Sequence, residues 1–119
     1  MRPTMSDVQP PSELQPSEAA RRHEQGEIEL VDVREQFEYD AGHVPGSTHI
    51  SMDGIAGRVD EIDKDKPVAF ICLMGARSGM VADYFRTLGY DAYNVMGGFA
   101  QWFEEDLPTA PDDAKVVTH

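Results

Sequence analysis

The stretch PVAFICLMGARSGM, residues 67–80, decides the fold predicted for this chain. Its first six residues are mostly apolar, which is typical of a strand buried on both faces of a parallel sheet. A short LMGA connection follows, and a helix is expected to begin at Ser78. Cys72, the one cysteine in the sequence, stands where the strand ends. Such a cysteine is either a small buried filler residue or a nucleophile.

Strand and helix signals alternate on both sides of this stretch. Runs of β-branched and apolar residues predict strands over 28–33, 67–72 and 91–96, with a short strand over 48–51. The predicted helices lie in 16–26, 34–47, 53–62, 78–89 and 97–107. This alternation predicts an α/β fold in which helices cover both faces of a central parallel sheet.

The predicted helix over 78–89 has the clearest pattern. Apolar residues recur along it at helical spacing and are expected to form one stripe. The members of this stripe are Met80, Val81, Tyr84, Phe85 and Leu88. Gly89 fits the C-terminal end of the helix.

The position of Cys72 favours a functional site. Ligands of open parallel sheets bind beyond the carboxyl ends of the strands, and Cys72 ends the most apolar strand. Backbone N–H groups at the start of the next helix, together with Arg77, are expected to form an anion pocket that favours a thiolate. Gly75 suits such a loop, because a tight cradle often needs a positive φ.

Other catalytic arrangements are not evident in the sequence. The four histidines show no metal-ligand spacing, so we expect no metal site and no cofactor. A nucleotide phosphate loop of the G-x-x-x-x-G-K-[ST] type is absent, and MGGF (residues 96–99) is interpreted as a glycine turn. Phe99 and Trp102 are predicted to be core aromatic residues.

The composition is that of one acidic globular domain. The 119 residues include 22 acidic and 10 basic side chains, which gives a formal net charge of −12. This charge argues against nucleic acid and anionic membranes as partners. We expect flexible tails over 1–12 and 109–119 and a single domain over 13–108. A lone thiol and an N-terminus without an apolar signal core indicate a cytoplasmic protein.

Three stretches resemble the rhodanese family of sulfurtransferases. CLMGARS (residues 72–78) resembles the active-site loop of that family, LVDVREQFEYDAGHVPGSTHI (residues 30–50) looks like its upstream signature, and LGYDAYNVMGGFAQW (residues 88–102) is similar to its closing stretch. The resemblance covers residues 14–107. It implies a rhodanese-like α/β domain that transfers sulfane sulfur through a cysteine persulfide.

This resemblance implies roles for the loop. Cys72 would be the nucleophile, and the persulfide anion would be held by the loop residues Leu73, Met74, Gly75, Ala76, Arg77 and Ser78. Arg77 is expected to meet a small anionic sulfur donor such as thiosulfate; the alternative is a structural pair with a carboxylate. The acceptor would be a thiol or cyanide, and a protein acceptor is a further option because Leu73 and Met74 are expected at the pocket rim.

The upstream signature is interpreted as structural support near the site. Asp32 is expected to pair with a loop N–H or an arginine, and Arg34 with Glu38, four positions further on. His43 is interpreted as fixing its loop, with general-base chemistry as the alternative.

Two other functions stay open at this stage. The protein could be a persulfide carrier or a regulatory module without high turnover. A phosphatase or arsenate reductase is less favoured, because the related phosphatase loops hold one more residue between cysteine and arginine than the C-x4-R spacing from Cys72 to Arg77.

Overall fold

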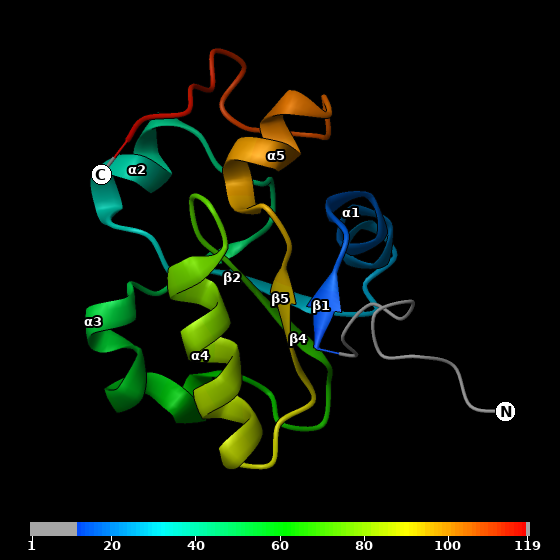
Figure 1. Cartoon of the computed structure of the whole chain (residues 1–119), viewed down its shortest axis with the longest axis vertical. Coiled ribbons are helices and arrows are strands. Elements are labelled where there is room, and N and C mark those ends of the chain that lie inside the picture. The colour runs from blue at the N-terminus through cyan, green and yellow to red at the C-terminus, as the bar shows by residue number, and fades with distance from the viewer. Residues whose placement is uncertain (1–11, 119) are drawn as a thin grey trace, which may run out of the picture.

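The computed structural model describes residues 12–118 and shows one five-stranded parallel sheet. The strands are β1 (Glu13–Leu14), β2 (Glu29–Asp32), β3 (Thr48–His49), β4 (Val68–Ile71) and β5 (Ala92–Val95), in the order β1-β5-β4-β2-β3. The helices are α1 (Pro16–Glu24), α2 (Gln36–Ala41), α3 (Met52–Ile55), η2 (Ala56–Glu61), α4 (Ala76–Thr87) and α5 (Gly98–Glu104) (Figure 1). The predicted α/β fold is confirmed.

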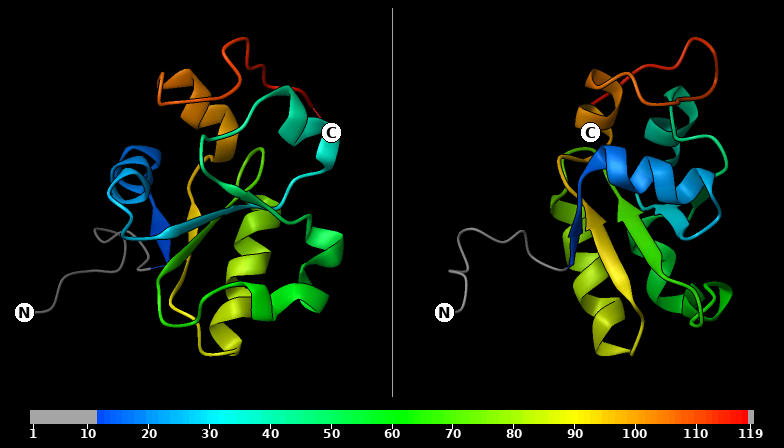
Figure 2. Two further views of the ribbon diagram at one scale, coloured as in Figure 1. Left: turned by 180° about the vertical axis from the view of Figure 1, so that it is seen from behind. Right: turned by 90° about the vertical axis from the view of Figure 1, so that its right-hand side faces the viewer.

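The central strand β4 explains why its sequence is apolar throughout. Val68 and Phe70 face the core formed with α3, η2 and α4, whereas Ala69 and Ile71 face the core formed with α1 and α5. Successive side chains of a strand point to opposite faces, so a strand covered on both sides needs an unbroken apolar run. Figure 2 shows α4 and α1 on opposite sides of the sheet.

The predicted helix at 78–89 differs from α4 in two respects. α4 begins at Ala76, two residues earlier, which places Arg77 and Ser78 in its first turn. The predicted stripe is also too wide: Val81 and Phe85 are buried, but Met80 and Tyr84 are 62% and 42% exposed. The side chains of Ser78, Val81, Ala82 and Phe85 share the buried face, since positions three and four apart lie on one side of a helix.

Two further elements depart from the sequence prediction. β1 was not predicted; its two residues add to the sheet edge by pairing with Asn94 and Val95 of β5. The helix expected over 53–62 is a short α-helix followed by a 3-10 segment, with a kink at Arg58. Two glycines in this region, Gly54 and Gly57, weaken its helix propensity.

The structure describes most of the expected C-terminal tail but almost none of the expected N-terminal tail. The N-terminal tail over 1–12 lies outside them except for Ser12. In the segment from 109 onwards, Ala110 and His43 exchange two backbone hydrogen bonds, and the Lys115 N–H donates to the Ala41 carbonyl. Val116 packs against the core of α1 and α5. Over 110–116 this segment therefore contacts the domain.

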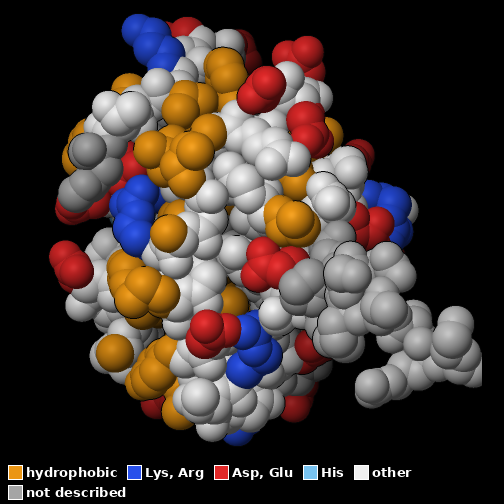
Figure 3. Space-filling view, viewed as in Figure 1, with side chains coloured by type: hydrophobic (Ala, Val, Ile, Leu, Met, Phe, Trp, Pro, Cys, Tyr) orange, Lys and Arg blue, Asp and Glu red, His pale blue; other side chains and the backbone are white. Residues whose placement is uncertain are grey.

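The surface seen in Figure 3 carries hydrophobic side chains over the region of α4, between scattered charged groups. Within residues 12–118, no helix is both long enough and apolar enough to cross a bilayer.

Candidate active site

Cys72 is the first residue after β4, at the carboxyl end of the central strand. It is 1% exposed and packs in the core of α3, η2 and α4, as a filler residue would. Its sulfur, however, meets polar groups: the Gly75 N–H donates to Sγ over 3.1 Å, and the Ser78 hydroxyl oxygen lies 3.2 Å from Sγ. These contacts make Cys72 a candidate nucleophile.

The loop conformation depends on Gly75. Its φ is +105°, a left-handed conformation that other residues rarely adopt, and it immediately precedes α4. The predicted positive φ is thus confirmed. This turn aims the Gly75 N–H back at Sγ and places the sulfur beside the N-terminus of α4. The partial positive charge of a helix N-terminus favours an anion there.

A second glycine pair supports the loop from the side of α5. Gly97 and Gly98 both have positive φ, and the N–H groups of Phe99 and Ala100 donate to the carbonyls of Cys72 and Leu73 at 2.7 and 3.0 Å. A Cβ on Gly98 would lie only 2.5 Å from both carbonyl oxygens. The predicted glycine turn is confirmed, and it also clamps the cysteine loop. Two consecutive glycines before an aromatic residue are the sequence signal for this close approach.

Arg77 points from α4 towards α2 and forms a bidentate ion pair with Glu38, with N···O distances of 2.9 and 3.1 Å. Burial raises the pKa of Glu38, but the hydrogen bonds from Arg77 and from the Glu35 N–H outweigh it and hold this pKa below its usual value. The same hydrogen bond raises the pKa of Arg77. The structural pair considered for Arg77 therefore forms. Glu38 therefore belongs to the site, although its position in the sequence predicts a pair with Arg34 instead.

The upstream signature contains a buried ion pair at the end of β2. Asp32 accepts hydrogen bonds from the Arg34 backbone N–H and guanidinium, and Arg34 also donates to the Gly42 carbonyl. The guanidinium stacks over Phe99, 4.5 Å from the ring centroid. The predicted Arg34–Glu38 pair is wrong. Arg34 precedes α2, so the helical i, i+4 rule does not apply to it.

His43 packs against Tyr39 with the two rings stacked, and its Nδ1 lies 2.7 Å from the Tyr39 carbonyl oxygen. Its backbone pairs with Ala110. These contacts match the interpretation that His43 fixes its loop. Within residues 12–118, no three histidine, cysteine, aspartate or glutamate side chains lie close enough together to hold a metal ion.

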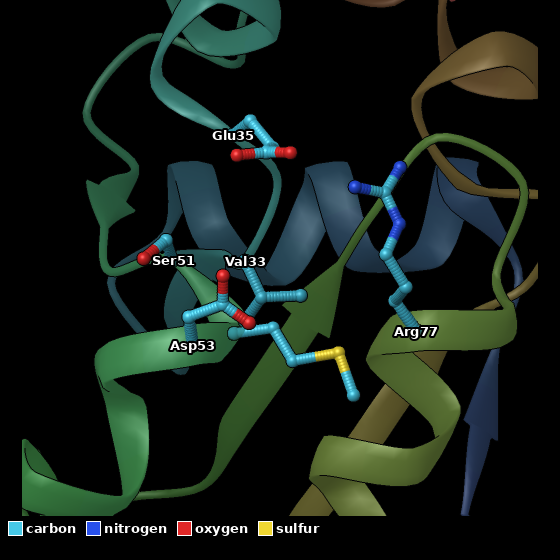
Figure 4. A pocket seen from close by; sticks show the side chains of 6 residues that line it. Val33, Glu35, Ser51, Asp53 and Arg77 are labelled. Atoms are coloured by element: carbon cyan, nitrogen blue, oxygen red, sulfur yellow. The ribbon is translucent and has the colours of Figure 1, made fainter. Parts of the chain in front are cut away.

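A cavity of about 210 Å³ lies beside the first turn of α4. Its lining residues are Val33, Glu35, Ser51, Met52, Asp53 and Arg77. Figure 4 shows Arg77 on the α4 side and the carboxylates of Glu35 and Asp53 across from it. The cavity therefore offers a charged, partly apolar space next to the first turn of α4.

Met74, at the tip of the cysteine loop, is 67% exposed.

Comparison with known proteins identifies the family of this chain. Residues 15–105 match the model of the rhodanese-like domain family. Thiosulfate sulfurtransferase GlpE of Pseudomonas syringae is 38% identical over 90 residues, which cover 75% of this chain and 84% of that protein. GlpE of Pseudomonas savastanoi is 37% identical over 101 residues, 84% of this chain and 91% of that protein.

Solved structures give the same result. A rhodanese-related protein from Thermoplasma volcanium superimposes with a TM-score of 0.78 at 26% identity, over 82% of this chain and 96% of that one. Fold and site together define an α/β protein with a cysteine loop at the carboxyl end of its central strand. The chain belongs to the rhodanese-like domain family, and its curated relatives support sulfurtransferase activity at the level of the family.

Proposed function

We propose that this protein is a sulfurtransferase that moves sulfane sulfur from a donor such as thiosulfate to cyanide or a thiol through a persulfide on Cys72. The observation that carries the proposal is the setting of Sγ. It lies at the carboxyl end of β4, 3.1 Å from the Gly75 N–H that precedes α4 and 3.2 Å from the Ser78 hydroxyl. Hydrogen-bond donors at a helix N-terminus stabilise a sulfur anion.

The chemistry consists of two displacements. The Cys72 thiolate attacks the outer sulfur of thiosulfate, a new S–S bond forms, and the bond to the sulfonate sulfur breaks. Sulfite leaves with that electron pair, and the protein keeps a persulfide anion. Cyanide or a thiolate then attacks the outer persulfide sulfur and releases the Cys72 thiolate. Such a covalent scheme gives ping-pong kinetics.

The loop residues supply the binding groups in this proposal. The backbone from Leu73 to Ser78 surrounds the outer sulfur, and Arg77 holds the anionic head of the donor. Its side chain is 28% exposed and lines the cavity. A guanidinium has more N–H groups than its pair with Glu38 uses, so Arg77 can bind an oxyanion while the pair persists.

The tip of the cysteine loop carries an exposed apolar side chain. Met74 is 67% exposed at the loop tip, where it offers a contact for an organic thiol or for a protein that accepts the sulfur. A nucleophile that must stay reduced between turnovers suits a reducing compartment, and we place the protein in the cytoplasm on that ground.

The test is to mix the protein with excess thiosulfate, without acceptor, and to measure the mass of the intact chain by mass spectrometry. We expect one added sulfur atom, which a reducing thiol removes by exchange. Cys72→Ser is the matched control, because serine is nearly isosteric but does not ionise; it should remain unloaded with an unchanged thermal transition. If the wild-type chain gains no sulfur from thiosulfate, 3-mercaptopyruvate or glutathione persulfide, the proposed function is wrong.

A further inference from the structure

We propose that Asn94 is a positioning residue that opposes ionisation of Cys72 by holding the hydroxyl proton of Ser78. The proposal rests on the proposed function only in taking Cys72 as the nucleophile. Asn94 lies on β5, outside the cysteine loop and the upstream signature. Its contribution comes through Ser78, which touches the sulfur directly.

A buried chain of hydrogen bonds links these residues. Ser78 Oγ lies 3.2 Å from Cys72 Sγ and 2.6 Å from Asn94 Oδ1. Cys72, Ser78 and Asn94 are all buried, so water does not compete for these contacts. When one of these hydrogen bonds is exchanged for another, the stability of the charged sulfur therefore changes directly.

The amide of Asn94 has a fixed orientation. Its Nδ2 group lies 3.1 Å from the Gly75 carbonyl oxygen and 3.1 Å from Glu13 Oε1. Both are acceptors when Glu13 is ionised, so they require the NH₂ group on that side. A flipped amide would turn its carbonyl oxygen towards them. The carbonyl oxygen of Asn94 therefore faces Ser78.

The position of the Ser78 proton follows from this orientation. Two oxygens 2.6 Å apart need a proton between them, and the Asn94 oxygen has none to give. Ser78 thus donates to Asn94 and presents a lone pair to Sγ. That arrangement suits a neutral thiol, whose S–H donates to Ser78 Oγ.

Ionisation of Cys72 requires the Ser78 hydroxyl proton to turn from Asn94 to the sulfur. When Cys72 loses its proton to solvent, the sulfur becomes an acceptor, and the Ser78 hydroxyl must rotate towards it. This rotation breaks the bond to Asn94 and leaves a buried amide oxygen without its donor, which is unfavourable. Asn94 and the thiolate therefore compete for one proton.

The persulfide changes that competition. Its negative charge lies mainly on the outer sulfur, so the inner sulfur, bonded on both sides, is a weak acceptor. Ser78 can then return to Asn94. The hydrogen-bond chain should thus penalise the free thiolate more than the persulfide, and it should favour the loaded form of the protein.

Charged groups around the loop also act on Cys72. On α4 and α2 they are Arg77 and Glu38, which neutralise each other, as do Asp32 and Arg34 at the end of β2. Glu13 of β1 lies behind Asn94. Substituting Ser78 leaves all of these contacts in place, whereas Asn94→Ala removes the hydrogen bond to Glu13. An effect that arises through Glu13 does not need the Ser78 hydroxyl, so the double variant described below separates it from the proposed proton competition.

The experiment measures the ultraviolet absorbance of the thiolate against pH. Because the chain has one cysteine, subtracting the spectrum of Cys72→Ser isolates the signal of Cys72. For Asn94→Ala we expect a midpoint about one pH unit below wild type, because Ser78 becomes free to donate to the thiolate. For Ser78→Ala we expect a midpoint about one unit above wild type, because the thiolate loses that donor.

The double variant decides between a proton effect and general disruption. Without the Ser78 hydroxyl, Asn94→Ala should have no further effect, so the double variant should match Ser78→Ala. If Asn94→Ala does not fold, Asn94→Val replaces it, since valine suits a strand. An unchanged or raised midpoint in the Asn94 variant overturns the proposal. The readout needs no sulfur donor, so it stands apart from failure of sulfur transfer.

Discussion

Arg77 of α4 and Glu38 of α2 are joined by two hydrogen bonds although they are 39 positions apart in the chain. Glu38 is completely buried, and its second carboxylate contact is the backbone N–H of Glu35, at the start of α2. The pair therefore ties α2 to the first turn of α4, directly after the cysteine loop. It fixes the direction of Arg77 and satisfies a buried carboxylate.

Replacing Glu38 by glutamine should lower the free energy of unfolding by about 1–3 kcal/mol near neutral pH, because a charge-assisted bond is lost. The folded-state pKa of Glu38 is depressed, so its contribution is present above the usual value of about 4.5 and is lost as pH falls through the lower folded pKa. Wild type should thus lose more stability on acidification than Glu38→Gln. Denaturant unfolding at several pH values measures this difference.

Glu61→Gln is the matched control. Glu61 pairs with Arg58, but both side chains are about half exposed, so solvent screens the pair and its loss should be nearly neutral. If Glu38→Gln and Glu61→Gln behave alike, the Arg77–Glu38 pair does not stabilise the fold.

Arg77 should distinguish sulfur donors by their charge. Arg77→Ala is expected to slow loading from thiosulfate by about tenfold or more relative to loading from an uncharged organic polysulfide, because only thiosulfate presents an anionic head to the guanidinium. Mass spectrometry of the sulfur adduct at short times measures both rates. If both donors slow by the same factor, Arg77 acts by shaping the loop through Glu38 and does not bind the donor.

The sequence predicts the central part of this site because burial leaves a strong signal. A strand covered on both faces must be apolar throughout, which located β4, and the single cysteine at its end marked the site. A glycine before the next helix indicated the left-handed turn at Gly75. Each of these features depends on neighbouring residues in the chain.

Contacts between distant segments could not be predicted in the same way. Glu38 was paired with Arg34 on helical spacing, but α2 begins only at Gln36 and Glu38 turns to Arg77 instead. Asn94 reads as an ordinary polar residue of a short strand, and its contact with Ser78 exists only because β5 lies beside β4. Nothing in the residues themselves shows which strands are neighbours.

The length of the cysteine loop should matter for sulfur transfer. One glycine inserted directly after Gly75 would move the start of α4 away from Sγ and displace Arg77 from Glu38. We expect clearly slower loading from thiosulfate. The same insertion after Asp65, in the exposed turn before β4, is the control and should leave loading unchanged. If loading survives the first insertion, loop size is not what suits this site to sulfur.

Gly98 should be irreplaceable because of its contact with the cysteine loop. In Gly98→Ala the new Cβ would lie 2.5 Å from the carbonyl oxygens of Cys72 and Leu73, at a φ of +62° that alanine rarely adopts. The N-terminus of α5 must then shift, which weakens the bond from the Phe99 N–H to the Cys72 carbonyl. We expect a loss of roughly 2 kcal/mol or more in the free energy of unfolding.

The same substitution should also slow sulfur loading, since the backbone that positions Sγ moves with the carbonyl of Cys72. Gly57→Ala is the control: its Cβ would meet nothing within 4 Å, and its φ lies outside the left-handed region. It should be neutral or more stable by about 0.5 kcal/mol. Denaturant unfolding and the loading rate are measured for both variants. A Gly98→Ala protein that keeps wild-type stability and loading would show that the α5 turn does not hold the cysteine loop.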